Sequence, residues 1–122
     1  MTVACLLVVA TVIVGWLMFV PLAHAGVPCH GVVGTASWYG SESGRTTASG
    51  QHFNPDGISA AMPNRSMLGK RVRVTYQGRS IVVLVDDIGP AARTGRVIDL
   101  SRGAARSLGI TGIGRVCVEM AG

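Results

Sequence analysis

The chain divides into a long apolar segment and a remainder in which apolar residues occur in short runs. Val3 to Val20 is almost unbroken apolar sequence, and the first charged residue is Glu42. From Gly31 onward, short β-branched runs are separated by clusters rich in Gly, Pro, Asn and Asp. This pattern is typical of strands joined by turns, so it predicts a hydrophobic leader followed by a small β-rich domain.

Two of the expected strands form a hairpin. Arg71 to Tyr76 alternates polar and apolar residues, whereas Arg79 to Val85 becomes continuously apolar after its first two positions. Alternation indicates a strand with one exposed face, and a continuous run indicates a strand buried on both faces. Gln77 and Gly78 form the turn between them. Four further strands are expected at Gly31 to Tyr39, Ile58 to Ala61, Arg96 to Leu100 and Arg115 to Met120.

One short helix is expected between the last two strands. Ser101 can serve as its N-cap, and Gly109 stands where a glycine commonly ends a helix. Between them, Ala104, Ala105 and Leu108 have the spacing of one buried stripe. Six short strands, one helix and 17 Gly favour an all-β fold, a small barrel formed by residues 26–122 as a single domain.

The apolar leader has two interpretations. Residues 1–25 end in Ala23-His24-Ala25, a pattern typical of a signal-peptidase site, and cleavage there leaves 122 − 25 = 97 residues. The run is also long enough to span a bilayer, so residues 3–23 could remain as an uncleaved membrane anchor. Both interpretations place residues 26–122 outside the cytoplasm, secreted or in a periplasmic cell envelope. Membrane contact is expected only if the leader is not cleaved.

The cysteines are divided between these two parts of the chain. Cys5 belongs to the leader, which leaves Cys29 and Cys117 in the exported domain. Disulfides persist in oxidising compartments, so we expect these two residues to form a bridge. Two unpaired buried thiols are the alternative. A zinc site is not expected, because no further Cys or His lies at ligand spacing.

The exported domain carries all the basic residues of a chain whose formal net charge is +5. A basic domain outside the cytoplasm suits an anionic partner. Cell-wall glycans with peptide carboxylates, teichoic acids and lipid headgroups are the common anions there, and nucleic acid is not expected. The alternative is a solvated basic face, since Arg71 and Arg73 alternate with valines.

Five short motifs follow one another along the domain, and together they are specific where each alone is not. They are Gly34 to Gly40 (GTASWYG), Thr47 to Gln51 (TASGQ), Ser59 to Ala61 (SAA), Val85 to Pro90 (VDDIGP), and Ile98 to Ser101 (IDLS) with Ala104 and Ala105. Their order and spacing resemble the rare lipoprotein A family. The resemblance covers essentially all of residues 26–122 and implies a six-stranded double-psi β-barrel. Expansins, barwin-like proteins and family 45 endoglucanases share that fold.

The resemblance also implies an activity. Members of the family look like lytic transglycosylases of the bacterial envelope that cut peptidoglycan glycan strands, and the aspartate of their Asp-x-Gly-Pro motif is the expected acid. That position is Asp87 here. Because the C6 hydroxyl of the sugar replaces water as the attacking group, a 1,6-anhydro end forms and one carboxyl group can serve as acid and then as base. A hydrolase would need a second carboxylate.

Departures from the family pattern leave alternatives open. Where the family usually carries Ala-Ala-His, this chain has Ala60-Ala61-Met62, and a thioether transfers no proton. Ile88 stands where an arginine is common. Asp87 could also serve the turn before Gly-Pro by bonding backbone amides. The alternative function is a non-catalytic glycan-binding or expansin-like wall-loosening module, and a secreted scaffold or inhibitor is a third.

A groove around Asp87 is expected to bind the glycan. Neighbouring residues on an extended strand face opposite sides, so only one of Trp38 and Tyr39 can line it, and Tyr39 is the candidate. The same argument separates Asp86 from Asp87, although Asp86 brings a second carboxylate close in sequence. Asp99 lies just before the expected helix, where it could be a groove carboxylate or a structural group.

The segment between the first two strands supplies further polar candidates. Thr47 and Ser49 could bond sugar hydroxyls or cap turns. Gln51 occupies a position that is acidic in some relatives, and His52 beside it could be a site residue or an exposed loop histidine. The full set of substrate-binding candidates is Tyr39, Thr47, Ser49, Gln51, His52, Met62, Asp86 and Asp99.

No cofactor is expected. The chain has no G-x-x-x-x-G-K-S/T motif for phosphate, no G-x-G-x-x-G motif after a strand, and no closely spaced pair of Cys or His. No metal ligands are assigned for the same reason, and the domain is expected to be a monomer.

Overall fold

The computed structural model of the protein describes residues 28–40, 46–90 and 92–122. The predicted signal peptide or anchor lies outside these ranges. Within them, no helix combines the length and the apolar character that crossing a membrane requires. The ranges contain all six of the strands that the sequence predicts.

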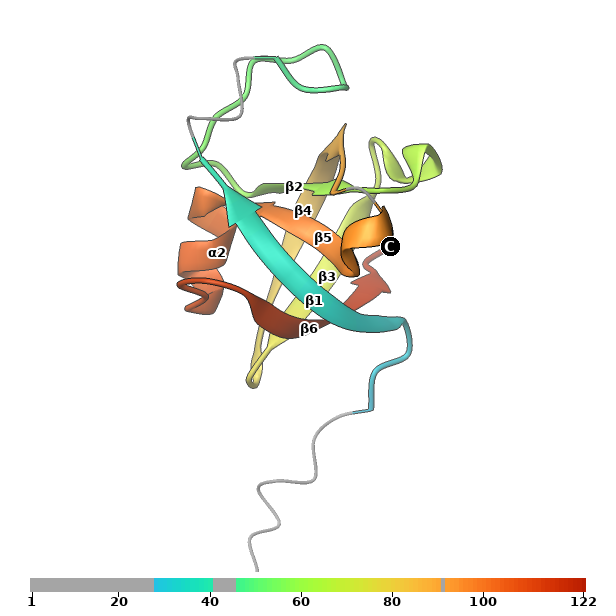
Figure 1. Cartoon of the computed structure of the whole chain (residues 1–122), viewed down its shortest axis with the longest axis vertical. Helices are drawn as coiled ribbons and strands as arrows, with labels where there is room; N and C mark the ends of the chain where they lie inside the picture. Colours follow the sequence, from blue (N-terminus) through green and yellow to red (C-terminus); the bar gives the residue numbers. More distant parts are fainter. Residues whose placement is uncertain (1–27, 41–45, 91) are drawn as a thin grey trace, which may run out of the picture.

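Six strands close into a barrel in the order β1-β5-β2-β4-β3-β6 (Figure 1). Their bounds are β1 Val32–Tyr39, β2 Ser59–Met62, β3 Arg71–Tyr76, β4 Arg79–Ile88, β5 Arg96–Ser101 and β6 Gly114–Met120. The other described elements are the helix α2 at Arg102–Leu108 and two 3-10 helices, η3 at Arg65–Met67 and η4 at Ala92–Thr94. For the residues that the structure describes, the prediction of a small six-stranded barrel with one short α-helix is confirmed.

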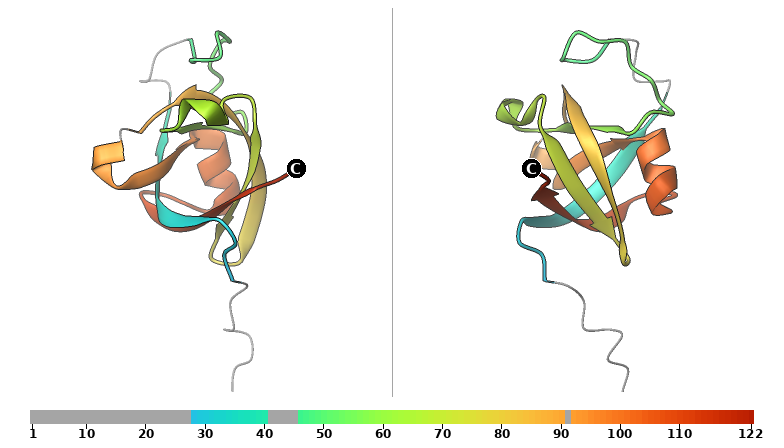
Figure 2. Two further views of the ribbon diagram at one scale, coloured as in Figure 1. Left: turned by 90° about the vertical axis from the view of Figure 1, so that its right-hand side faces the viewer. Right: turned by 180° about the vertical axis from the view of Figure 1, so that it is seen from behind.

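Two of the strand pairs are parallel and the others are antiparallel. β1 runs parallel to β5, and β2 runs parallel to β4, although neither pair is consecutive in the chain. Parallel neighbours cannot be joined by a tight turn and need longer crossover connections. The segment 46–58, which leads into β2, lies beyond one end of the barrel in all three views (Figures 1 and 2).

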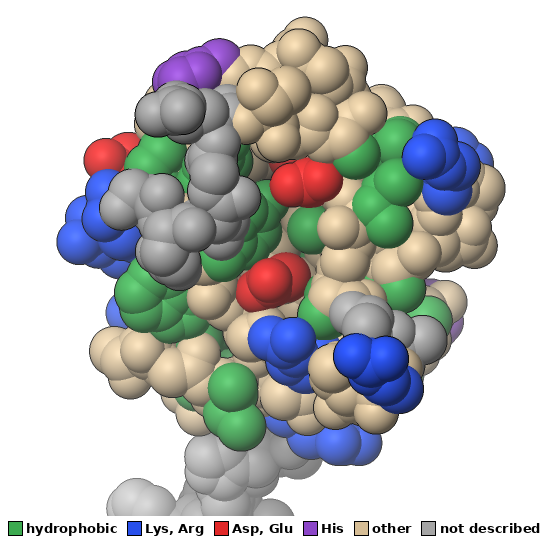
Figure 3. Space-filling model, turned by 45° about the horizontal axis from the view of Figure 1, so that its top comes forward, with side chains coloured by type: hydrophobic (Ala, Val, Ile, Leu, Met, Phe, Trp, Pro, Cys, Tyr) green, Lys and Arg blue, Asp and Glu red, His purple; other side chains and the backbone are tan. Residues whose placement is uncertain are grey.

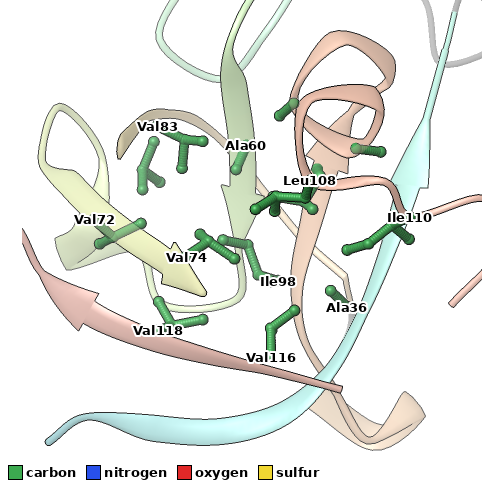
Figure 4. Close-up of a cluster of buried hydrophobic side chains, with 14 residues drawn as sticks. Ala36, Ala60, Val72, Val74, Val83, Ile98, Leu108, Ile110, Val116 and Val118 are labelled. Carbon is green, nitrogen blue, oxygen red and sulfur yellow. The ribbon is translucent and has the colours of Figure 1, made fainter. Parts of the chain in front are cut away.

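Branched aliphatic side chains fill the barrel interior. Val74, Ile98 and Val116 project between the strands, and Leu108 enters from α2 (Figure 4). Each of these four side chains is at most 2% exposed. Because such side chains are stiff and closely packed, they hold the strands at a constant spacing. The fixed spacing of the strands also fixes the distances between polar side chains on their outer face.

The helix α2 is capped as its sequence predicts. The Ser101 hydroxyl oxygen accepts the Ala104 N–H at 3.2 Å, and Gly109 ends the helix in the left-handed conformation at φ 80°. Ser101 is fully buried, and its hydroxyl also donates to the Gly57 carbonyl at 2.7 Å and accepts the Ser59 N–H at 3.2 Å. One side chain therefore joins the start of α2 to the chain that enters β2.

Strand β4 differs from its prediction in two respects. The expected strand ended at Val85, whereas β4 continues to Ile88 because its last residues pair with β2. The prediction of burial on both faces is wrong, since Val82 is 43% exposed. Val82 pairs with the exposed Arg73 on the solvent side of the hairpin. The alternation predicted for the partner strand is confirmed, with Arg71 and Arg73 both exposed.

Cys29 and Cys117 form the predicted disulfide. Cys117 lies in β6 and Cys29 lies just before β1, so the bridge ties the beginning of the barrel to its last strand. The two residues are 88 positions apart in the chain. A crosslink of this span restricts the unfolded chain, and in the chain-entropy description it stabilises the fold by about 4 kcal/mol.

Reduction of this bridge should lower the free energy of unfolding by about 4 kcal/mol, because the unfolded chain regains the entropy that the crosslink removed. Urea unfolding followed by circular dichroism, with and without reductant, measures the difference. The double variant Cys29→Ala/Cys117→Ala is the control, and reductant should not change its unfolding midpoint. Equal midpoints for the oxidised and reduced parent would contradict the prediction.

Candidate active site

A β-bulge in β4 sets the direction of two acidic side chains. Ala60 of β2 pairs with Val85 of β4. The next residue, Ala61, pairs with Asp87, so Asp86 is an extra residue on β4. One extra residue shifts the alternation of side chains by one position. Val85 points into the core, and Asp86 and Asp87 both follow on the outer face, so the prediction that these two aspartates face opposite sides is wrong.

Four residues form a row across the outer face of the barrel, which we call the acidic row. In order from β1 to β4, each paired with the next, they are Ser37, Asp99, Ala61 and Asp87. Neighbouring strands lie about 4.8 Å apart, so the two aspartates flank Ala61 with backbones about 10 Å apart. Figure 3 shows two acidic side chains in the middle of one face, with hydrophobic side chains around them and basic side chains near one of them.

Two backbone amides orient the Asp87 carboxylate. Its Oδ1 atom accepts hydrogen bonds from the N–H groups of Ala48 and Ile88, each at 2.9 Å. Among the described residues, its Oδ2 atom has no hydrogen-bond partner. The bond to Ile88 is the turn-type contact that the sequence left open, whereas the bond to Ala48 comes from the segment between β1 and β2. One oxygen is therefore fixed and the other can meet a ligand.

The turn at 47–51 packs against the end of β4. The Thr47 N–H donates to the Gln51 carbonyl at 2.9 Å, and the Thr47 hydroxyl lies 2.7 Å from that of Ser49. The Ser49 N–H donates to the Asp86 carbonyl at 3.1 Å. Thr47 is 5% exposed, whereas Ser49 and Gln51 are exposed. The structure therefore brings these three candidates beside the two aspartates, with the Thr47 hydroxyl used inside the turn.

Asp86 is half-buried, like Asp87, but one of its carboxyl oxygens is enclosed. Its Oδ1 atom is buried and has no hydrogen-bond partner among the described residues. Burial, followed by the negative charge of Asp87, raises the pKa of the Asp86 carboxyl. Hydrogen bonds to its own backbone and to the Ser59 side chain oppose that shift. The folded protein therefore favours the protonated form of Asp86 more than the unfolded chain does.

Tyr39 lies on the same face as the acidic row, while Trp38 faces the other side and donates its indole N–H to the Thr111 carbonyl. The Tyr39 side chain is 7% exposed, and its ring stacks on Phe53 with centroids 4.8 Å apart. The ring is thus covered by Phe53 instead of open to a sugar. Its hydroxyl is buried with no partner in the described ranges. Burial, with the charges of three nearby aspartates, raises the pKa of Tyr39.

A chain of hydrogen bonds holds Asp99. The Ser37 hydroxyl donates to Asp99 Oδ1 at 2.8 Å, and Arg96 Nη1 donates to the Ser37 oxygen at 2.7 Å. Arg96 also donates through Nε to the Thr94 hydroxyl at 3.3 Å. The sequence left Asp99 as a groove carboxylate or a structural group. Its register puts it on the same face as Asp87.

Two of the substrate-binding candidates lie apart from the acidic row. Met62 follows Ala61 on β2, so its side chain turns to the other side of the strand, packs against the core cluster and lines a hollow of about 370 Å³. His52 is exposed and pairs with Thr46 in an isolated bridge beside the 47–51 turn. Neither side chain bonds to the acidic row in the part of the chain that the structure describes. Both stay predictions as substrate contacts.

Three residues of this face were missed by the sequence analysis. Phe53 covers Tyr39, and Ser37 and Arg96 hold Asp99. Strand alternation could have identified Ser37, which lies two positions before Tyr39 on β1. No comparable signal exists for Arg96, because only the pairing of β1 with β5 brings it to Ser37.

The chemistry that this face can supply by itself is proton transfer. Within the described ranges, no group of three or more His, Cys, Asp or Glu side chains is arranged to hold a metal ion. Carboxyl groups in an apolar setting are common acids and bases in enzymes, and two carboxyl groups across a sugar are a frequent arrangement in glycan cleavage. The acidic row is therefore a candidate active site for a carbohydrate.

Comparison with known protein families gives a match over most of the chain. The model of the family described as lytic transglycolase matches residues 31–120. The matched region contains all six strands and α2. It therefore includes every residue of the acidic row.

Curated relatives are similar over the same region. A Nostoc sp. protein named "Probable endolytic peptidoglycan transglycosylase RlpA" is 54% identical over 87 residues, which cover 66% of this chain and 23% of that protein. "Endolytic peptidoglycan transglycosylase RlpA" of Yersinia pestis is 47% identical over 90 residues, which cover 71% of this chain and 24% of that protein. The chain thus spans about a quarter of the length of these relatives.

A solved structure shares the fold. The Streptomyces papain inhibitor matches with a TM-score of 0.61 and 21% sequence identity, over 80% of this chain and 100% of that chain. At this identity the likeness concerns the fold alone. Since that protein is named as an inhibitor, the barrel by itself does not decide the function, and the site residues must do so.

Asp86→Asn should raise the midpoint of thermal unfolding at pH 7 by about 4 °C, because it removes the charge of a half-buried carboxylate whose enclosed oxygen has no partner among the described residues. A raised folded-state pKa gives stability that is present at low pH and is lost as pH rises through that pKa. The difference in unfolding midpoint between Asp86→Asn and the parent should therefore become smaller as the pH is lowered toward 4. Differential scanning calorimetry at both pH values measures it.

Asp56→Asn is the control with the opposite sign. The hydrogen bond from Arg102, helped by the charges of Arg102 and Arg106, holds the pKa of the exposed Asp56 below its ordinary value. That stabilisation is present at pH 7 and is lost as pH falls, so this variant should unfold at a slightly lower temperature at pH 7. A lower midpoint for Asp86→Asn at pH 7 would show that its buried charge is not unfavourable.

Proposed function

Because the chain belongs to the lytic transglycolase family, we propose that it cleaves the glycan strands of peptidoglycan to 1,6-anhydro ends, with Asp87 as general acid and base. The orientation of Asp87 is the observation that carries this proposal. Its Oδ1 is bonded to the amides of Ala48 and Ile88, and its Oδ2 is without a partner among the described residues. A fixed carboxyl group with one oxygen available is what proton transfer to a bound sugar requires.

In the proposed reaction Asp87 acts twice. Its protonated Oδ2 donates a proton to the glycosidic oxygen as the bond between C1 and that oxygen breaks. The C6 hydroxyl oxygen of the same sugar then bonds to C1, and its proton passes to the Asp87 carboxylate. No water is consumed and the acid is regenerated, so the proton balance needs only one carboxyl group.

The turn at 47–51 is proposed to contact the glycan. Ser49 and Gln51 are exposed beside the amide that binds Asp87, and their side chains can bond sugar hydroxyls. The Ala48 N–H in the same turn holds the Asp87 carboxylate, so a glycan that contacts the turn also affects the orientation of this carboxylate. Binding and orientation of the acid are therefore coupled.

We also propose that the protein acts in the cell envelope as a secreted or periplasmic domain. Its relatives are named for peptidoglycan, which is an envelope polymer. Residues 1–25 would serve as the signal peptide, or residues 3–23 as a retained membrane anchor. The net charge of +5 suits a polymer that carries peptide carboxylates. Action as a monomer is part of this proposal.

A non-catalytic glycan-binding or expansin-like wall-loosening role is the second candidate, and Met62 is the observation that favours it. Its thioether cannot transfer a proton, and its side chain packs against the core cluster. The two candidates would use the same face of the barrel. They differ in whether a covalent bond breaks, so one experiment separates them.

Asp87→Asn should reduce the release of 1,6-anhydro-ended fragments from purified sacculi by roughly 10²–10⁴-fold. The amide keeps an oxygen that can accept the two backbone N–H bonds, but it cannot carry the transferred proton. Mass spectrometry of the soluble fragments, from sacculi with and without stem peptides, measures the loss. Asp56→Asn, exposed and ion-paired with Arg102, is the control and should keep full activity.

Three results would decide against the transglycosylase. Fragments with reducing ends from the parent would indicate hydrolysis. Full activity of Asp87→Asn would show that another group is the acid. No product from the folded parent on either substrate would exclude cleavage of these glycans, and cosedimentation with sacculi would then test the glycan-binding candidate.

A further inference from the structure

We propose that Asp99 is a second catalytic carboxylate, which stabilises the positive charge that develops at the anomeric carbon when Asp87 protonates the glycosidic oxygen. This inference rests on the proposed function and adds the group that stands across the substrate from Asp87. Ser37 and Arg96 are its positioning residues. The site then has two carboxyl groups with different roles, whereas the sequence analysis assigned catalysis to one.

The register of the strands supports this pairing. Asp99 of β5 and Asp87 of β4 both pair with Ala61 of β2, so they stand on opposite sides of one residue. Two interstrand steps separate their backbones by about 10 Å. In enzymes that cleave glycans, the two carboxyl groups lie roughly 5–9.5 Å apart, so side chains from backbones at this spacing can both reach one sugar ring.

The surface between the two aspartates is small and apolar. Ala61 carries only a methyl group, is 4% exposed, and packs with Tyr39 and Phe53 in one buried cluster beneath this part of the face. Ligand sites commonly combine an apolar floor with a few polar groups at the border. A sugar ring has apolar C–H faces and polar edges, so a ring bound between the two aspartates, above this cluster, would direct its polar edges toward the carboxyl groups.

The two aspartates differ in their hydrogen bonds, and this difference assigns their roles. Asp87 is bonded to backbone amides and has one oxygen available for a proton. Asp99 accepts the Ser37 hydroxyl, whose oxygen already accepts an N–H of the Arg96 guanidinium. The positive guanidinium makes the Ser37 hydroxyl a stronger donor, and this hydrogen bond stabilises the ionised form of the Asp99 carboxylate. Asp99 is therefore suited to act as a fixed negative charge.

A fixed negative charge has a defined task in glycan cleavage. C1 and the ring oxygen become positive as the bond to the leaving oxygen breaks. A preorganised carboxylate interacts more strongly with that transition state than with the neutral substrate, so it accelerates the reaction. Asp99 forms no bond to the sugar and exchanges no proton, so the proton balance of the Asp87 reaction is unchanged.

Asp99→Asn is the direct test, because the amide keeps an oxygen for Ser37 and removes the charge. With soluble peptidoglycan glycan fragments, kcat should fall about 100-fold while KM stays within about threefold. The remaining products should still carry 1,6-anhydro ends. Asp56→Asn makes the same chemical change at an exposed ion pair and should alter neither constant.

Ser37→Ala and Arg96→Gln test the positioning chain. Each should lower kcat about tenfold with KM unchanged, and neither should add a further loss in the Asp99→Asn background, because residues that act through one group are not additive. A purely structural role would give additive losses. Arg93→Gln is the matched control. Arg93 is an exposed arginine in η4, so its substitution should change neither kcat nor KM.

Binding of a cationic probe gives a measurement that does not need turnover. An iminosugar with the configuration of N-acetylglucosamine carries its positive charge near the position of C1. Its Kd should rise at least tenfold in Asp99→Asn, while a neutral chito-oligosaccharide should bind parent and variant equally. Isothermal titration calorimetry on the folded proteins measures both.

The outcomes distinguish this inference from the proposed function. Unchanged kcat in Asp99→Asn, with loss in Asp87→Asn, would overturn the inference and leave the proposed function intact. An inactive parent would contradict the proposed function, and an Asp99-dependent Kd for the iminosugar would then still support the charge-binding role. Reducing-end products that depend on Asp99 would overturn the role, since Asp99 would then activate water. If Asp99→Asn does not fold, unchanged kcat in Ser37→Ala overturns the inference.

Discussion

The arrangement of the acidic residues depends on one extra residue in β4. Asp86 has no partner of its own on β2, and this offset moves Asp87 from an inward position to the outer face of the barrel. In a regular strand Asp87 would point into an interior filled with valine, where an unpaired carboxylate costs several kcal/mol. The bulge lets β4 supply a core residue, Val85, and two outer carboxyl groups in three consecutive positions.

The barrel and the segment that crosses its end stabilise each other. The turn at 47–51 is distant from β4 in the chain, yet its amides bind the Asp87 side chain and the Asp86 carbonyl. Farther along, the Ser101 hydroxyl bonds Gly57 and the Ser59 N–H, so the chain entering β2 is also attached. The segment is therefore anchored at the acidic pair and at the start of α2. Its placement and the orientation of the acid depend on the same contacts.

Much of the candidate site could be predicted from the sequence, and each wrong prediction has a specific physical cause. Tyr39 and Trp38 face opposite sides as predicted, because β1 is regular at these residues. Asp86 and Asp87 do not face opposite sides as predicted. The bulge that turns them to one face arises from pairing with β2, and the local sequence of β4 gives no sign of it. Tyr39 was expected to meet a sugar but stacks on Phe53, whose approach depends on the path of the intervening segment. The resemblance identified Asp87, and it carried no information about the hydrogen bonds of Asp99.

The amino-acid pattern was enough to predict the β3–β4 hairpin and the caps of α2, and the family resemblance predicted the barrel. Turns and caps involve residues close in the chain, and the Cys29–Cys117 bridge was expected because these are the two cysteines that follow the apolar leader. Two features became visible only in the folded protein: Val82 faces solvent, and Asp99 stands across Ala61 from Asp87. The tertiary structure also brought Arg96 and Ser37 to Asp99. These features depend on the register between strands far apart in the chain, and register is set by packing that no local pattern records.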